Sequence, residues 1–86
     1  AAAERRAGLA PLKRSMQAAE KVVEKLTADI ARIDAALADT ALYTKDPGKA
    51  RDLSQSRGQL AKELSAAEEA WLMATEAYET AASGEG

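Results

Sequence analysis

Hydrophobic residues recur along the first half of the chain at alternating gaps of three and four residues. This spacing places them on one face of an α-helix in a seven-residue repeat, whose positions are labelled a to g and whose apolar residues stand at a and d. With Leu9 at position a, the stripe consists of Leu9, Leu12, Met16, Ala19, Val23, Leu26, Ile30, Ile33 and Leu37. The pattern predicts a helix over about 10–39.

A second stripe with the same alternation follows in the second half of the chain. With Trp71 at position a, it consists of Ala50, Leu53, Arg57, Leu60, Leu64, Ala67, Trp71, Ala74, Tyr78 and Ala81. Arg57 is its one polar member, and the stripe predicts a helix over about 47–81. Each helix can bury so narrow a stripe only against another helix. The expected fold class is therefore all-α, a two-helix antiparallel coiled-coil hairpin over residues 9–82.

The segment 40–46 interrupts both stripes and predicts a turn. Asp46 followed by Pro47 is typical of a helix start, because Asp accepts a free backbone N–H and Pro at the first helical position loses no hydrogen bond. Tyr43 is expected to fold back with Leu42 over this end of the hairpin. At the ends of the chain, residues 1–8 are expected to be a lead-in from N-terminal domains that this chain lacks, and residues 83–86 a disordered tail.

The register of the two helices can be predicted from residue size. In an antiparallel pair, the numbers of facing residues add up to a constant, and sums of 90 and 83 both fit the turn. A sum of 90 sets Trp71 against Ala19, so that a large residue faces a small one, and sets Arg57 against Ile33. A sum of 83 sets Trp71 against Leu12. We prefer 90, with the methylenes of Arg57 on Ile33 and its charged head in water.

Gly58 lies inside the second helix at an outward b position. There a glycine costs about 1 kcal/mol relative to alanine. Two interpretations stay open: the glycine is merely tolerated, or it marks a bend or the close approach of a partner.

Composition excludes most kinds of chemistry. The chain has no His and no Cys, so the usual zinc, haem and iron–sulfur ligand sets, catalytic Ser–His or Cys–His pairs, and disulfides cannot form. Gly48-Lys49 lacks the remainder of a P-loop, and Glu68-Glu69 would point apart on a solvated helix face. We expect no enzyme activity and no catalytic, metal-binding or cofactor-binding residue in this chain. No apolar run is long enough for a membrane span, and a cytoplasmic location without a membrane partner is expected.

Charge is distributed unevenly along the chain. All twelve basic residues lie in 1–62, whereas residues 63–86 hold six acidic residues and no basic one. A hairpin brings the start of the first helix beside the end of the second. We therefore expect one cluster to meet the other, namely Arg5, Arg6, Lys13 and Arg14 with Glu68, Glu69, Glu76 and Glu79.

The turn end has a basic excess of its own. Residues 43–62 carry five basic and two acidic side chains, a net charge of +3, and no acidic partner strand is expected there. Basic side chains of this kind neutralise phosphates. The candidate nucleic-acid contacts are Lys45, Lys49, Arg51 and Arg57.

The turn and the second helix together carry a family resemblance. The matching positions are Asp39, Leu42, Tyr43, Asp46, Pro47, Lys49, Leu53, Trp71 and Leu72. With them, most of residues 9–80 resembles the C-terminal coiled-coil domain of ABC-F (Uup-type) ATP-binding cassette proteins. The chain departs from that family in having Thr40 and Ala41 where Pro-Glu is common.

The resemblance implies a function outside catalysis. Full-length members of that family carry two ATP-binding cassettes and no transmembrane domain, and they act on the ribosome or other nucleoprotein. ATP and Mg would bind in cassettes outside this chain, and the hairpin would be an accessory arm that contacts the ribosome, RNA or DNA. The alternative is a purely structural coiled-coil spacer or dimerisation element, a weak homodimer that pairs two hairpins into a four-helix bundle.

Overall fold

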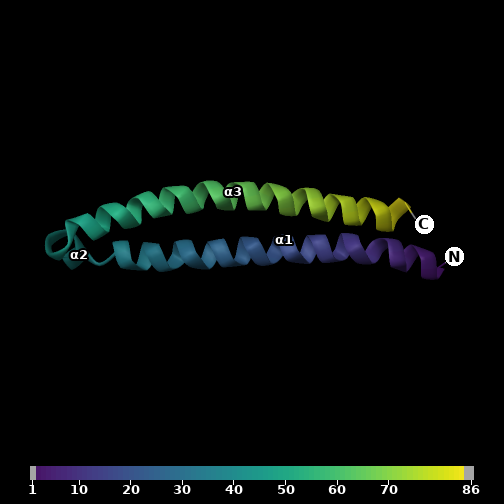
Figure 1. The fold of residues 1–86 in the computed structure, drawn as a ribbon, viewed down its shortest axis with the longest axis horizontal. Coiled ribbons are helices and arrows are strands. Elements are labelled where there is room, and N and C mark those ends of the chain that lie inside the picture. The colour runs from purple at the N-terminus through teal and green to yellow at the C-terminus, as the bar shows by residue number, and fades with distance from the viewer. Residues whose placement is uncertain (1, 85–86) are drawn as a thin grey trace.

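The computed structural model describes residues 2–84, which form three helices and no strand. They are α1 (Ala2–Leu37), α2 (Thr40–Lys45) and α3 (Pro47–Gly84). The two long helices run side by side in opposite directions, and α2 joins them at one end (Figure 1). The prediction of an all-α chain is confirmed. The expectation of only two helices is wrong, because the turn contains the short α2.

The long helices extend beyond their predicted ends. α1 begins at Ala2 and continues through Gly8 and Pro11, so the expected lead-in over 1–8 is helical from Ala2 onwards. The Ala, Glu and Arg residues of this segment have high helix propensity, which outweighs the two helix-breaking residues. α3 runs to Gly84, so the expected tail at 83–86 is helical as far as that residue, and residues 85 and 86 lie outside the described part.

The two long helices pack through the faces that the hydrophobic stripes predict. Every member of the first stripe is partly buried, and so is every member of the second except Ala50, which is buried, and Arg57, which is exposed. Ala50 is 5% exposed and is the only buried residue among residues 7–84, the part of the chain whose side-chain burial is described. The molecule is a rod of 66 × 16 × 14 Å whose interior is this single seam.

The register is indicated by an ion pair across the seam. The guanidinium of Arg57 donates to both carboxylate oxygens of Asp34, from Nε at 2.5 Å and from Nη2 at 3.2 Å. With facing numbers that add up to 90, Arg57 stands opposite Ile33 and beside Asp34. With a sum of 83 it would face Leu26, eight residues or about 12 Å along α1 from Asp34, too far for this contact.

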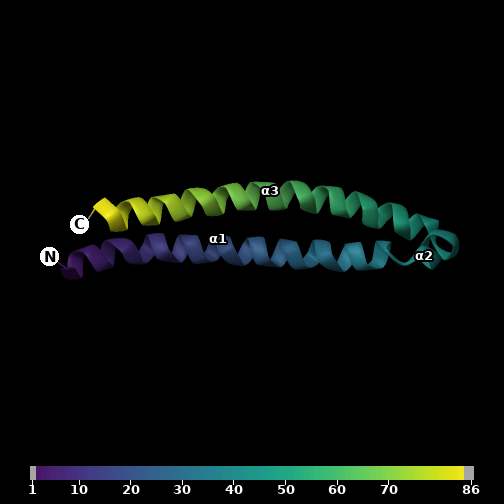
Figure 2. The same cartoon turned by 180° about the vertical axis from the view of Figure 1, so that it is seen from behind.

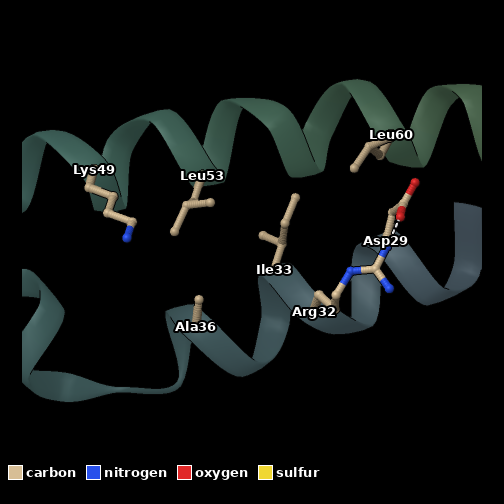
Figure 3. A pocket seen from close by; sticks show the side chains of 7 residues that line it. All are labelled: Asp29, Arg32, Ile33, Ala36, Lys49, Leu53 and Leu60. Carbon is tan, nitrogen blue, oxygen red and sulfur yellow. Dashed lines mark hydrogen bonds and ion pairs between the residues drawn. The ribbon is translucent and has the colours of Figure 1, made fainter.

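Side chains near the ion pair agree with this register. Ile33 points toward α3 between Leu53 and Leu60, and Ala36 lies opposite Leu53 (Figure 3). The same register sets Ala19 against Trp71, and both residues are partly buried. That individual pairing stays a prediction. The expectation that the charged head of Arg57 extends into water is only partly correct, because the guanidinium binds Asp34 of α1.

Candidate nucleic-acid interface

The short helix α2 owes its shape to side-chain hydrogen bonds. The Oδ1 atom of Asp39 accepts the N–H of Ala41 at 3.0 Å and so caps the start of α2. The Oγ1 atom of Thr44 donates to the carbonyl of Ala41 at 3.0 Å. At the other end, the N–H of Asp46 donates to the carbonyl of Leu42 at 2.8 Å. Because of these local bonds, the segment 40–46, expected to be a turn, contains a helix of about 1.7 turns.

Tyr43 connects α2 to the end of α1. Its hydroxyl donates to the carbonyl of Leu37, the last residue of α1, at 2.8 Å. That carbonyl has no partner within α1, because the last carbonyls of a helix are left free. Half of the Tyr43 side chain remains exposed, so the residue closes the end of the hairpin without being buried in it.

Asp46 and Pro47 fix the start of α3. The Oδ1 atom of Asp46 accepts the backbone N–H of Lys49 at 3.0 Å, and Pro47 is the first residue of the helix, where its missing N–H leaves no intrahelical bond unmade. The backbone of Lys49 is thereby held against Asp46, the residue that directly follows α2. Lys45 stands in the last turn of α2, so both lysines project from the same hydrogen-bonded end of the rod.

Three of the four candidate contacts are exposed cations at this end. Lys45, Lys49 and Arg51 lie within seven consecutive residues, and none of them makes an ion pair with a described side chain. We call these three residues the tip cations. Arg57 is separate from them, because it lies about 15 Å along α3 from Pro47 and is paired with Asp34.

The Arg57–Asp34 pair also shifts the ionisation of both groups. Its hydrogen bonds hold the pKa of Asp34 below the ordinary value and raise the pKa of Arg57, and the Coulombic attraction acts in the same directions. A guanidinium already bound to a carboxylate is a poorer phosphate ligand, because its best donors are occupied. Arg57 is therefore the weakest of the four candidates.

The expected basic excess at the tip is offset by α1. Residues 29–57 hold five basic and five acidic side chains, a net charge of zero. The prediction that the tip charges lack an acidic partner strand is wrong for Arg57, which pairs with Asp34 of α1. Lys45, Lys49 and Arg51 are therefore unpaired with described side chains, but the end of the rod that carries them has no net charge.

A shallow groove opens beside the tip cations. Its volume is roughly 470 Å³, and its lining consists of Asp29, Arg32, Ile33, Ala36, Lys49, Leu53 and Leu60. The aliphatic side chains form its floor, and Lys49 extends into it from α3 (Figure 3). A base or an aliphatic group could rest on such a floor next to a lysine.

Arg32 was not among the candidates from the sequence, although it borders this groove. It pairs with Asp29, which also accepts from Lys25 at 2.9 Å. The hydrogen bond from Lys25 is the main cause of a lowered pKa at Asp29, and Arg32 adds to it. Arg32 is four residues from Ala36, so its position beside the groove could have been inferred from helical spacing.

At the other end of the rod the expected clusters do not meet. Lys13 and Arg14 form no ion pair with Glu68, Glu69, Glu76 or Glu79 in the described structure, and the side chains of Arg5 and Arg6 lie outside it. The reason lies in the repeat. Arg14, Glu69 and Glu76 occupy f positions, which point directly away from the seam, and all three are exposed.

Other kinds of site are not formed by the described residues. Over 2–84, no three His, Cys, Asp or Glu side chains lie together in a way that could hold a metal ion. None of the helices in that range has an apolar stretch long enough to cross a bilayer.

Comparison with known families gives one match. The model of a family described as "ABC transporter C-terminal domain" matches residues 11–76, which includes the tip and most of both long helices. No curated protein and no solved structure matches the chain.

Proposed function

The chain belongs to the ABC transporter C-terminal domain family, and we propose that it is the nucleic-acid-contacting arm of an ABC-F (Uup-type) protein. Membership makes it an accessory domain of an ABC protein rather than a catalytic cassette. We further propose that the full protein is cytoplasmic and that its cassettes, which lie outside this chain, bind ATP and Mg. The partner of the arm in this proposal is RNA, DNA or the ribosome. The motif around Tyr43 and Asp46-Pro47 supports the ABC-F assignment.

The observation that carries the proposal is the position of the tip cations. Both termini of the described chain lie at one end of the rod and α2 lies at the other (Figure 2), and the long dimension is 66 Å. A domain attached at the termini would therefore sit far from Lys45, Lys49 and Arg51. A rigid arm of this kind can carry a small phosphate-binding tip to a surface that the attached domain does not reach.

Three contacts give weak, salt-sensitive binding. Phosphate neutralisation by lysine and arginine supplies nearly all of non-specific affinity. The neutral net charge of residues 29–57 limits long-range attraction. We expect measurable binding at low salt and little at physiological salt.

The test compares two triple variants of equal charge. Fluorescence anisotropy with a labelled structured RNA and a labelled DNA duplex is measured for the parent, for Lys45→Ala/Lys49→Ala/Arg51→Ala, and for Lys13→Ala/Arg14→Ala/Lys21→Ala. The tip variant should lose most of the binding, and the second variant should keep it. Equal losses in the two variants would mean non-specific attraction to the whole chain, and unchanged binding by the tip variant would contradict the proposal.

A structural spacer or dimerisation element is the second candidate function. It is favoured by the exposed apolar side chains of Val22 and Met73, which lie on the half of the rod that contains the termini. Absence of nucleic-acid binding by the parent at low salt would leave this candidate in place of the first.

A further inference from the structure

One flank of the rod carries an exposed apolar strip that the hairpin itself does not cover. In an antiparallel pair the g positions of the two helices share a flank, with the c positions just outside them. The groove near the tip shows this arrangement, because Asp29 and Ala36 of α1 and Lys49 of α3, all at g, line it together. Farther from the tip the same flank holds Ala18, Val22, Ala66, Ala70, Met73 and Ala77.

This strip is apolar and exposed over its whole length. Val22 is 50% exposed and Met73 is 65% exposed, and the four alanines are exposed as well. No charged residue interrupts the c and g positions of α3 between Ala66 and Ala77. Alanines let a facing helix approach closely, while Val22 and Met73 supply most of the area that such a helix would cover.

The rim of the strip has opposite charge on its two helices. On α1 the neighbouring f positions are Arg14 and Lys21, and on α3 they are Glu69 and Glu76. In the register with a sum of 90, Arg14 is level with Glu76 and Lys21 is level with Glu69. These matched charges cannot meet within one hairpin, because all four point away from its seam and are exposed.

We infer that this flank is the interface of a parallel homodimer, in which α1 of each copy packs on α3 of the other. A two-fold axis parallel to the rod brings each basic rim against the acidic rim of the second copy at the same level. An axis perpendicular to the rod would instead set α1 on α1 and bring like charges together. Charge complementarity therefore selects the parallel arrangement.

The dimer leaves the tip cations of both copies free at one end of the assembly, so it is independent of nucleic-acid binding. It also gives the uneven charge along the chain a role, since basic residues near the start of α1 and acidic residues near the end of α3 oppose both helix dipoles. In the dimer, ion pairs between the basic rim of one copy and the acidic rim of the other offset this unfavourable interaction with the helix dipoles. Within one copy these charged residues form no such pairs in the described structure.

A charge-swap experiment tests the interface. Sedimentation equilibrium from micromolar to millimolar concentration is run on the parent, on Arg14→Glu/Lys21→Glu and on Glu69→Lys/Glu76→Lys. Each variant should self-associate about tenfold more weakly than the parent or worse, because symmetry places four like-charge pairs in its interface. An equimolar mixture of the two variants should form a heterodimer.

Controls separate a failed interface from a failed fold. Both variants should keep the helical circular dichroism of the parent, because the changed side chains are exposed. Lys45→Glu/Arg51→Glu changes the net charge by the same amount as Arg14→Glu/Lys21→Glu but at the tip, and it should dimerise like the parent. A parent that stays monomeric, or a mixture that does not associate, would overturn the proposal.

Orientation is tested with a single spin label. Because the chain has no Cys, Ala38→Cys gives one label near the tip. Ala38 lies about 30 Å along α1 from the centre of the strip, so rods in opposite directions would separate the labels by about 60 Å. A distance of that size would overturn the parallel arrangement, whereas the parallel dimer predicts a much shorter one.

Discussion

Arg57 of α3 holds Asp34 of α1 across the seam, with a hydrogen bond from the guanidinium to each oxygen of the carboxylate. It is the only ion pair between the two long helices among the side chains of the described structure. Arg57 stands at an a position, where the repeat calls for an apolar residue. Both side chains remain nearly half exposed, so its main effect is to favour one register over another rather than to add much stability.

Replacing Asp34 should weaken the dependence of stability on acid. The folded pKa of Asp34 is lowered, chiefly by the hydrogen bonds from Arg57. Its carboxylate therefore stabilises the fold above the ordinary pKa of 3.8, and this contribution is lost as the pH falls from there through the folded pKa. The melting temperature of Asp34→Asn, followed by circular dichroism from neutral pH downward, should fall less steeply than that of the parent.

The control for this variant is Asp52→Asn, which neutralises an exposed carboxylate that has no ion pair with a described side chain. Its acid profile should follow that of the parent. An Asp34→Asn profile that also follows the parent would show that the ion pair does not form in solution.

Truncation of Trp71 should destabilise the hairpin. Trp71 is partly buried in the seam, so Trp71→Ala should cost about 2–3 kcal/mol, below the usual 3–5 for a buried Trp. For a domain of this size the melting temperature should fall by about 10 °C or more. Leu72→Ala is the matched control, because Leu72 is 57% exposed. If both variants lost the same stability, the assignment of Trp71 to the seam would be wrong.

Gly58→Ala should stabilise the chain. A Cβ atom added to Gly58 would meet nothing within 4 Å, so the glycine marks no close approach by another part of the described chain. The substitution should add about 1 kcal/mol to the free energy of unfolding and raise the melting temperature by about 4–8 °C. Ala31→Gly, at an exposed site in α1, should have the opposite effect. A destabilised Gly58→Ala would instead support a required bend or a partner at this point.

The sequence was sufficient for the faces of the long helices, because a repeat of three and four residues allows only one buried stripe on each. It was not sufficient for the ends. The segment from Ala2 to Leu9 is helical because of its helix propensity, although Gly8 and Pro11 suggest a break in the helix. α2 depends on hydrogen bonds made by the side chains of Asp39 and Thr44, which a hydrophobic repeat does not predict.

For the candidate site, the sequence shows which residues are basic, but it did not predict which of them form ion pairs with acidic side chains. The pairing of Arg57 with Asp34 requires the register and a rotamer, neither of which is encoded in the spacing of one helix. The expected meeting of the basic cluster at the start of α1 with the acidic cluster at the end of α3 failed for a reason that the repeat contained, since Arg14, Glu69 and Glu76 occupy outward f positions.

The most direct test of the tip as a phosphate-binding site is the salt dependence of DNA duplex binding. With three phosphate contacts by Lys45, Lys49 and Arg51, the logarithm of the affinity should fall against the logarithm of the salt concentration with a slope of about −2.7. The variant that replaces all three by alanine should show a slope near zero, and the variant at Lys13, Arg14 and Lys21 should keep the slope of the parent. A tip variant with an unchanged slope would contradict the account.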